Sequence, residues 1–352
     1  MQKLLLTFFL AIPFLIAAQQ KTHVPDDNFE AFLESYGYGD GIENNDSVWT
    51  SAIDTLTVLS VGAFGTYKGI EDFTNLKEMY CYGTTQLGEP YYIGNLDLSY
   101  NTLLTKLYII DCTIDTFNIT QNPALKHLTY TGVTAPPLDV SGNINLEYLN
   151  CKQSSLNALD ISNNVDLDTL ICHGNSLTSL DLTQNINLKQ LICNGYYFTS
   201  LNLSKNINLE HFECSCFIPS ISLKNSPYLK IFDIRLPATT NPSHITPERV
   251  DIQNGNNQNI TLFNVKNCPN LVCVNVDDSS YSSTASNWQI DDVNLYTENC
   301  IVSGIEEEKP FTKNKTLIKI VDILGRETAP KPNIILFYIY TDRTVEKRLM
   351  ID

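Results

Sequence analysis

The chain has few basic residues for its length. Its 352 residues include 23 Lys and Arg against 39 Asp and Glu, which gives a formal net charge of −16. Binding to nucleic acid or to an anionic lipid surface requires a basic patch. The charge balance therefore argues against both kinds of partner, and we expect the acidic surplus mainly to keep the protein in solution.

Long apolar runs are also scarce. The one long run covers residues 4–18, behind the basic Lys3, and it ends in the small residues Ala17 and Ala18. This order is typical of a secretory signal peptide. The alternative is a transmembrane anchor, but the run is shorter than the ~20 residues that a membrane span requires. We therefore expect residues 1–18 to be removed on export, leaving a mature chain without a membrane span.

Catalytic motifs are missing. The sequence contains no nucleophile elbow, phosphate-binding loop, dinucleotide-binding glycine motif or HExxH metal motif. Three of the five histidines lie at repeat positions that should face outward on a regular sheet, where no burial tunes a pKa. We predict no catalytic residue, no metal site and no cofactor. These three histidines are His127, His173 and His211.

A period of 21 residues dominates the middle of the chain. The unit from Leu167 to Asn185 contains the pattern LxxLxLxxN twice, with cysteine in one leucine position, and this spacing is the signature of a leucine-rich repeat. The LxL pieces are strand-like, and stacked units share a core that one unit could not close. We expect one asparagine amide per unit to bond the backbone at each bend. The asparagine ladder comprises Asn101, Asn122, Asn143, Asn164, Asn185 and Asn206.

Both halves of the unit carry the strand motif. We therefore predict a mainly β solenoid with parallel strands on both sides. The sequence resembles the nested 21-residue class of bacterial leucine-rich repeats called IRREKO over about residues 73–276. We assign the repeats to residues 73–272, with an irregular stretch at 235–261. A short helical N-terminal cap should occupy residues 19–72 and a C-terminal cap residues 273–302.

The N-terminal cap is expected to begin with a short helix. Asp27 and Glu30 have the spacing of a capping box. The loop at Asp40 resembles an EF-hand-like loop that some relatives carry here. Tyr36 and Tyr38 occupy the positions of the first acidic ligands, so we reject a calcium site.

Seven of the ten cysteines fall into two groups, a column of five and a pair. In-register rungs hold neighbouring β-carbons about 4.8 Å apart, farther than the ~3.8 Å that a disulfide prefers, so we interpret the cysteines of one inward column as small apolar core residues. Cys273 and Cys300 bracket the C-terminal cap, where they could form a disulfide or remain free, and Trp288 between them should cover the last rung. The column contains Cys81, Cys151, Cys172, Cys193 and Cys214.

The composition changes after the C-terminal cap. Residues 303–312 read as a linker, and strand-like alternation follows at 315–326, 337–340 and 345–351. Through "VDILGRE" and "YIY…TVEK", residues 313–352 resemble the C-terminal sorting domain of type IX secretion cargo. The resemblance implies the type IX machinery as a partner, cleavage after export, and release or attachment at the cell surface. The alternative is a small β appendage of the cap.

The outward positions of the first strand carry the candidate binding surface. Tyrosines gather there in the first four rungs, and tyrosine supplies large, rigid, amphipathic contact area. The competing explanation is that tyrosine is simply a good strand former. Tyr91 and Tyr92, in a loop expected to protrude around residues 88–94, should add to this surface. The candidate ligand-binding residues are Tyr80, Tyr82, Lys106, Tyr108, His127, Tyr148, Lys152 and His173.

These features together predict a monomeric, non-catalytic protein that is secreted or displayed on the outer-membrane surface. Its ligand would be a protein or a glycan, as expected of an adhesion module. Two alternatives stay open: a structural surface scaffold without a specific ligand, and an exported hydrolase. The hydrolase is disfavoured, because caps, repeats and sorting domain leave no room for a separate catalytic domain.

Overall fold

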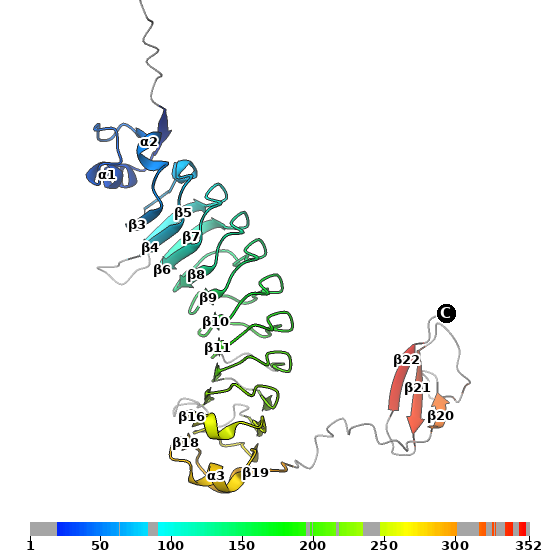
Figure 1. Ribbon diagram of the computed structural model, residues 1–352. Coiled ribbons are helices and arrows are strands. Elements are labelled where there is room, and N and C mark those ends of the chain that lie inside the picture. The colour runs from blue at the N-terminus through cyan, green and yellow to red at the C-terminus, as the bar shows by residue number, and fades with distance from the viewer. Residues whose placement is uncertain are drawn as a thin grey trace, which may run out of the picture. The chain divides into compact units, whose positions relative to one another are not determined.

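The computed structural model divides into two units, Met1–Cys300 and Ile301–Asp352 (Figure 1). The predicted signal peptide and linker lie outside the described residues. The structure describes residues 20–300 apart from 63, 84–90, 195–197, 199, 216–217 and 235–246, together with 317–321, 326, 328, 335–340 and 345–349.

The first unit is a β solenoid built on one long parallel sheet of 11 strands. Successive rungs pair in register, so that Leu149 of one rung lies opposite Leu170 of the next. This arrangement confirms the predicted fold class. In chain order the strands are β3 (Val58–Gly62), β4 (Glu78–Tyr82), β6 (Lys106–Ile110), β8 (His127–Thr131), β9 (Tyr148–Asn150), β10 (Thr169–Ile171), β11 (Gln190–Ile192), β12 (His211–Glu213), β14 (Ile231–Asp233), β16 (Leu262–Asn264) and β18 (Trp288–Gln289).

The second side of the solenoid carries parallel strands mainly near its two ends. β5 (Tyr91–Asp97) pairs with β7 (Cys112–Asn118), and a four-stranded sheet forms near the C-terminal end. Between these sheets the described residues bend in short turns instead. The loop expected around residues 88–94 is wrong in part, because Tyr91 to Gly94 belong to β5. The four-stranded sheet contains β13 (Ser220–Ser222), β15 (Arg249–Asp251), β17 (Cys273–Asn275) and β19 (Tyr296–Thr297).

The asparagine ladder holds neighbouring rungs together inside the solenoid. All six side chains are fully buried, and each amide donates two hydrogen bonds to carbonyl oxygens of earlier rungs. Asn143 Nδ2, for example, donates to the carbonyls of Ile119 at 2.9 Å and Asn122 at 3.0 Å. Each of these carbonyls also accepts a backbone N–H, as Ile119 does from Asn122, so the asparagine amides supply a second donor to carbonyl oxygens that are buried away from water.

The cysteine column lies inside the same core. Cys81, Cys151, Cys172 and Cys193 are buried thiols that are not in disulfides. Burial raises the pKa of the Cys151, Cys172 and Cys193 thiols, that of Cys172 to about 12, so these three side chains act as neutral core residues. Cys214 is equally buried but is disulfide-bonded, so the interpretation of the whole column as free thiols is wrong at this residue.

The first helix of the N-terminal cap is α1 (Asp27–Ser35). Its N-cap residue is Asp26, which accepts hydrogen bonds from the backbone of Asn28 and Phe29. The predicted capping box at Asp27 and Glu30 is therefore wrong, because Glu30 turns toward a loop. The remaining elements of this cap are β1 (Lys21–His23), β2 (Ser47–Trp49), α2 (Thr50–Ile53) and the 3-10 helix η1 (Ile70–Asp72).

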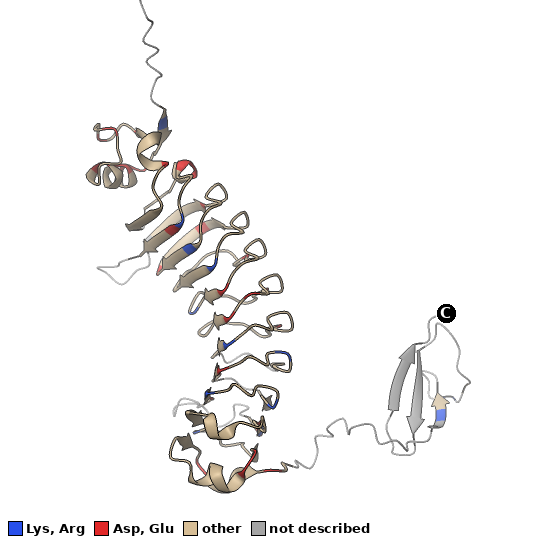
Figure 2. Cartoon of the chain, in the orientation of Figure 1, with Lys and Arg blue, Asp and Glu red and all other residues tan. Residues whose placement is uncertain are grey.

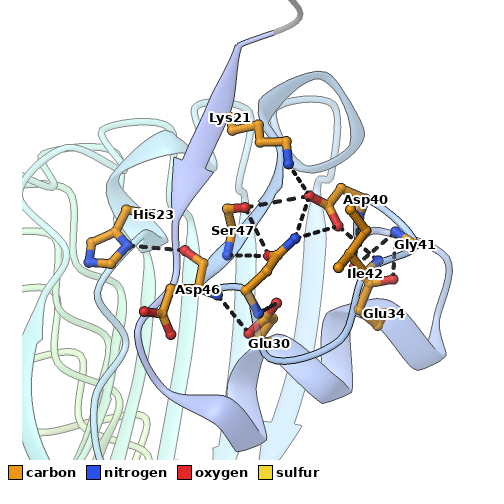
Figure 3. A network of polar contacts seen from close by, with 10 residues as sticks. Lys21, His23, Glu30, Glu34, Asp40, Gly41, Ile42, Asp46 and Ser47 are labelled. Atoms are coloured by element: carbon orange, nitrogen blue, oxygen red, sulfur yellow. Dashed lines mark hydrogen bonds and ion pairs between the residues drawn. The ribbon is translucent and has the colours of Figure 1, made fainter.

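A polar network joins the helix to that loop (Figure 3). The buried Glu30 carboxylate accepts hydrogen bonds from the backbone of Asn45 and Asp46, both at 3.1 Å. Asp40 pairs with Lys21 and accepts hydrogen bonds from the Asn45 side chain, and these contacts lower the pKa of Asp40 to about 2. The loop is thus organised by the protein's own hydrogen-bond donors and one lysine.

Aromatic side chains close the C-terminal end of the solenoid. Trp288 lies on Phe263 with ring centroids 4.5 Å apart, and Phe263 stacks in turn on Phe232 at 5.1 Å. A disulfide joins Cys273 to Cys300, whose Cα atoms are 5.9 Å apart. Other elements of this region are the 3-10 helix η2 (Asn257–Asn259), α3 (Ser279–Thr284) and the 3-10 helix η3 (Val293–Leu295).

The second unit contains a three-stranded antiparallel sheet. β21 (Ile335–Tyr340) pairs on one side with β20 (Leu317–Val321) and on the other with β22 (Val345–Leu349). Across the described parts of both units, no helix has the length and apolar character needed to cross a membrane.

Candidate functional site

Five of the predicted binding residues form one continuous stack of rings on the outer face of the long sheet. The ring centroids of Tyr82 and Tyr80 are 6.4 Å apart. Tyr80 stacks on Tyr108 with ring centroids 4.7 Å apart and an interplanar angle of 12°. Tyr108 then contacts His127 at 4.9 Å, and His127 stacks on Tyr148 at 4.0 Å and 3°. We call these five residues the aromatic ladder.

The spacing of the ladder follows from the backbone. Alternation along β4 turns Tyr80 and Tyr82 outward while Cys81 between them is buried. Parallel in-register pairing then sets Tyr80 directly opposite Tyr108, at the strand separation of about 4.8 Å. That separation brings two flat rings into offset-stacked contact.

Glu78 and Lys106 flank the part of the aromatic ladder that lies on β4 and β6. The Tyr80 hydroxyl donates to Glu78 Oε2 at 2.7 Å, and Lys106 Nζ lies 2.9 Å from Glu78 Oε1. The hydrogen bond to Glu78 raises the pKa of Tyr80 to about 12. Lys106 is therefore near the ladder, but its charge is already paired.

A groove of about 430 Å³ lies beside the part of the aromatic ladder that contains His127 and Tyr148. Its volume is within the range of small-ligand sites, but charged side chains rather than apolar ones make up most of its wall. Lys126 pairs with Glu147 across it at 2.6 Å. Figure 2 shows basic and acidic residues interspersed along the solenoid. The groove is lined by Thr105, Lys106, Lys126, His127, Glu147, Tyr148 and Asp168.

His127 is half-buried within the ladder and is held as a neutral ring. Burial, and then the positive charge of Lys106, lower the pKa of His127 below its usual value. Thr129 Oγ1 lies 3.4 Å from His127 Nε2. The neutral ring suits stacking between Tyr108 and Tyr148, because it places no unpaired charge between the two rings.

Lys152 and His173 lie apart from the aromatic ladder. They occupy neighbouring rungs, where the backbone amide of Gln153 donates to the His173 carbonyl at 2.9 Å. Burial and the charge of Lys152 lower the pKa of His173. Tyr92 is also apart, because it lies on β5 of the other sheet, where its hydroxyl contacts Asp115. Our expectation that Tyr92 adds to the first-sheet surface is therefore wrong.

The histidine with a carboxylate partner, His211, lacks a nucleophile. Its Nε2 lies 2.6 Å from Glu213 and its Nδ1 lies 3.0 Å from the side chain of Gln190. Both ring nitrogens are thus occupied, and among the described residues neither contacts a serine, threonine or cysteine that it could activate.

Three carboxylates of the N-terminal cap have the spacing of a metal site. Oxygens of Asp27, Glu30 and Asp46 lie within 4.8 Å of one another. Both Glu30 oxygens already accept backbone hydrogen bonds, which gives Glu30 a structural role in joining the helix to the loop.

A column of exposed aliphatic residues was missed in the sequence. These residues follow the ladder asparagines directly, at the same 21-residue period, and each has 44–51% of its surface exposed. The period itself could have revealed them, because residues that repeat in phase line one edge of the solenoid. The column consists of Ile144, Val165, Ile186 and Ile207.

Comparison with known proteins finds likeness only among solved structures. No family model and no curated protein matches the chain. The functional domain of InlJ from Listeria monocytogenes, described as including a cysteine ladder, is 18% identical with a TM-score of 0.42, covering 93% of this chain and 98% of that one. Internalin C2 from the same organism is 20% identical with a TM-score of 0.48, covering 60% and 97%.

A leucine-rich-repeat protein from Leptospira interrogans is also similar, at 15% identity and a TM-score of 0.36, covering 54% of this chain and 56% of that one. These structural neighbours are bacterial repeat proteins. The assignment of a solenoid rests on the strand register of this chain and not on these scores.

Proposed function

We propose that the protein is a non-catalytic binding module whose ligand contacts the aromatic ladder. The observation that carries this proposal is the unbroken contact of five aromatic rings across four rungs. Tyrosine is a good strand former anywhere in a sheet, but propensity alone does not require that successive rings touch. Clustered tyrosines are characteristic of binding hot spots.

The ring geometry favours a protein as the ligand. In the stacked part of the ladder, each ring covers the face of its neighbour and leaves mainly edges and hydroxyl groups to a ligand. A sugar that stacks on an aromatic residue needs an open ring face, whereas a polypeptide can use edges and hydrogen bonds. Among the residues that the structure describes, the hydroxyls of Tyr108 and Tyr148 make no hydrogen bond and can donate to a partner.

Export is part of the proposal. The sequence of residues 1–18 supports a signal peptide, and the alternation of residues 313–352 supports a type IX sorting domain. The product would be a monomer that is secreted or held at the outer-membrane surface. Detection of the mature chain outside cells, and its retention in the periplasm when residues 313–352 are removed, would test this route.

The binding face is tested by changing Tyr80, Tyr108 and Tyr148 together to alanine in the full chain. The variant and the unchanged protein are probed on an array of proteins and glycans. We expect the unchanged protein to bind at least one protein, and the triple variant to lose at least ten-fold in affinity. Hot-spot aromatic residues typically contribute about 2 kcal/mol or more each, so ten-fold is a conservative threshold.

A matched control uses three tyrosines that are exposed elsewhere. Tyr36, Tyr100 and Tyr228 expose 66%, 69% and 58% of their surface, and their joint change to alanine should leave affinity unchanged. Equal loss in both triple variants would indicate a general effect on the fold. Binding only to glycans would refute the protein ligand, and binding to nothing would favour the structural scaffold.

A further inference from the structure

Two buried thiols meet where the chain crosses from the long sheet to the second side. Cys81 is the inward residue of β4, and Cys112 is the first residue of β7. Both are free and neither is exposed. The two thiols act directly on each other's ionisation, which places their sulfur atoms close together.

The backbone around this pair explains the contact. Asp111, with φ of 55°, turns the chain inward immediately before Cys112. Gly83 then donates its backbone N–H to the Ile110 carbonyl at 2.8 Å, and the Cys112 thiol donates to the same carbonyl at 3.2 Å. A β-carbon on Gly83 would lie only 1.9 Å from the Asp111 carbonyl oxygen. The two segments therefore approach more closely than ordinary neighbouring strands.

Tyr67 completes the surroundings of the pair. Its hydroxyl lies 3.1 Å from Cys81 Sγ. The interactions with Cys112 and with Tyr67 lower the pKa of the Cys81 thiol in spite of its burial.

We propose that Cys81 and Cys112 form a disulfide that ties the strand bearing Tyr80 and Tyr82 to the second side of the solenoid. The oxidant is a disulfide donor such as oxidised glutathione. The Cys81 thiolate attacks one donor sulfur, which forms a mixed disulfide and releases one thiolate. The Cys112 thiolate then attacks the Cys81 sulfur and releases the second. Two protein thiols are thereby oxidised, the donor is reduced to two thiols, and these take up the two protons.

The cysteines of the core column that lie on successive rungs are held too far apart to form a disulfide with each other. Cys151 and Cys172 lie on successive parallel rungs, with the Cys151 amide bonded to the Ile171 carbonyl at 2.8 Å. Rungs at this spacing hold β-carbons about 4.8 Å apart, beyond the ~3.8 Å that a disulfide prefers. They serve as a control pair within the same core.

The timing of the reaction follows from burial. Because Cys81 and Cys112 are closed off in the folded chain, a donor must reach them while the rungs are still forming. The experiment therefore refolds the full chain from denaturant and reductant into a glutathione redox buffer, and then blocks the remaining thiols with an alkylating reagent in denaturant.

Trypsin separates the relevant residues. Cleavage after Lys77, Lys106 and Lys126 places Cys81 in peptide 78–106 and Cys112 in peptide 107–126. Mass spectrometry without reduction should show these two peptides linked, and reduction should separate them. The peptides that hold Cys151 and Cys172 should each carry an alkyl group.

The disulfide between Cys273 and Cys300 is the internal control for oxidation. Where that bridge has formed, alkylation of both Cys81 and Cys112 would overturn the proposal, as would linkage of either residue to any other cysteine. Protein isolated without refolding from an oxidising compartment gives a second sample for the same map. In a Cys112→Ser variant, Cys81 should carry an alkyl group.

Discussion

Replacement of Asn143 by alanine tests whether the asparagine ladder holds the rungs together. Asn143 is fully buried, and its amide donates to the carbonyls of Ile119 and Asn122. Alanine removes both hydrogen bonds, worth about 0.5 to 1.5 kcal/mol each, while each carbonyl keeps its backbone donor, the amide of Asn122 or of Leu125. The Asn143 Oδ1 atom itself has no partner in the structure, so its removal offsets part of this loss. The net loss of unfolding free energy should be about 1 to 2 kcal/mol.

Asparagine 145 provides the matched control on the same rung. Its amide also donates to a carbonyl, that of Pro123 at 2.8 Å, but this contact is exposed. Water can replace it, so Asn145→Ala should cost only about 0.5 kcal/mol. Urea unfolding followed by circular dichroism measures both variants. Equal midpoints for Asn143→Ala and Asn145→Ala would refute the reasoning.

Substitution of Asn143 by aspartate gives a sharper test of the same contacts. A carboxylate cannot donate to the two carbonyls that Asn143 bonds, so Asn143→Asp should be less stable than Asn143→Ala at pH 7. Burial raises the pKa of such a carboxyl in the folded state. Its destabilisation should therefore be greatest above the folded pKa and should decrease as the pH falls toward the unfolded value of about 4. The stability of Asn143→Ala, measured over the same pH range, is the reference for the pH dependence of the rest of the protein.

Three further predictions concern the aromatic ladder and the C-terminal end of the solenoid. Burial and the charge of Lys106 lower the pKa of His127, so Lys106→Ala should raise that pKa in an NMR titration. Because the folded state favours the neutral ring, the contribution of His127 to stability is present above its unfolded pKa of about 6.5 and is lost as the pH falls through the folded pKa. The Glu78 hydrogen bond raises the pKa of Tyr80 to about 12, so Glu78→Gln should lower it, as followed by NMR of labelled tyrosine; an unchanged value would contradict the contact. Trp288→Ala should cost about 3 to 5 kcal/mol because it uncovers Phe263, and urea unfolding should show a smaller loss for Trp288→Phe.

The period made much of the fold predictable from the sequence. A residue that recurs every 21 positions has the same surroundings in each rung, so burial of Asn143 implies burial of Asn164. The same reasoning located the inward cysteines of the long sheet. It predicted strands along both sides, but on the second side the middle rungs bend in turns, where a bend and a strand share similar inward leucines.

Contacts that cross from one column to another were not predictable in this way. The aromatic ladder passes from the column of Tyr82 to that of Tyr80 and then to that of His127, so no single outward column contains it. The meeting of Cys81 with Cys112 depends on the turn at Asp111, whose left-handed conformation no pattern in the sequence indicated. The 21-residue period predicts only contacts that recur in each rung, and neither the aromatic ladder nor the contact of Cys81 with Cys112 recurs in this way.

The rigidity of the aromatic ladder bears on how the protein could bind. An isolated exposed tyrosine such as Tyr228 must lose side-chain freedom when a partner binds, at about 0.5 to 1.5 kcal/mol for each immobilised side chain. Tyr80, Tyr108 and Tyr148 are already restrained by stacking on neighbouring rings. Much of their side-chain entropy is therefore lost on folding, before a ligand binds. Equal contact area should therefore give higher affinity on the ladder than at isolated tyrosines. A change that loosens the stack without removing a tyrosine, such as His127→Ala, should weaken binding even where the ligand does not touch His127.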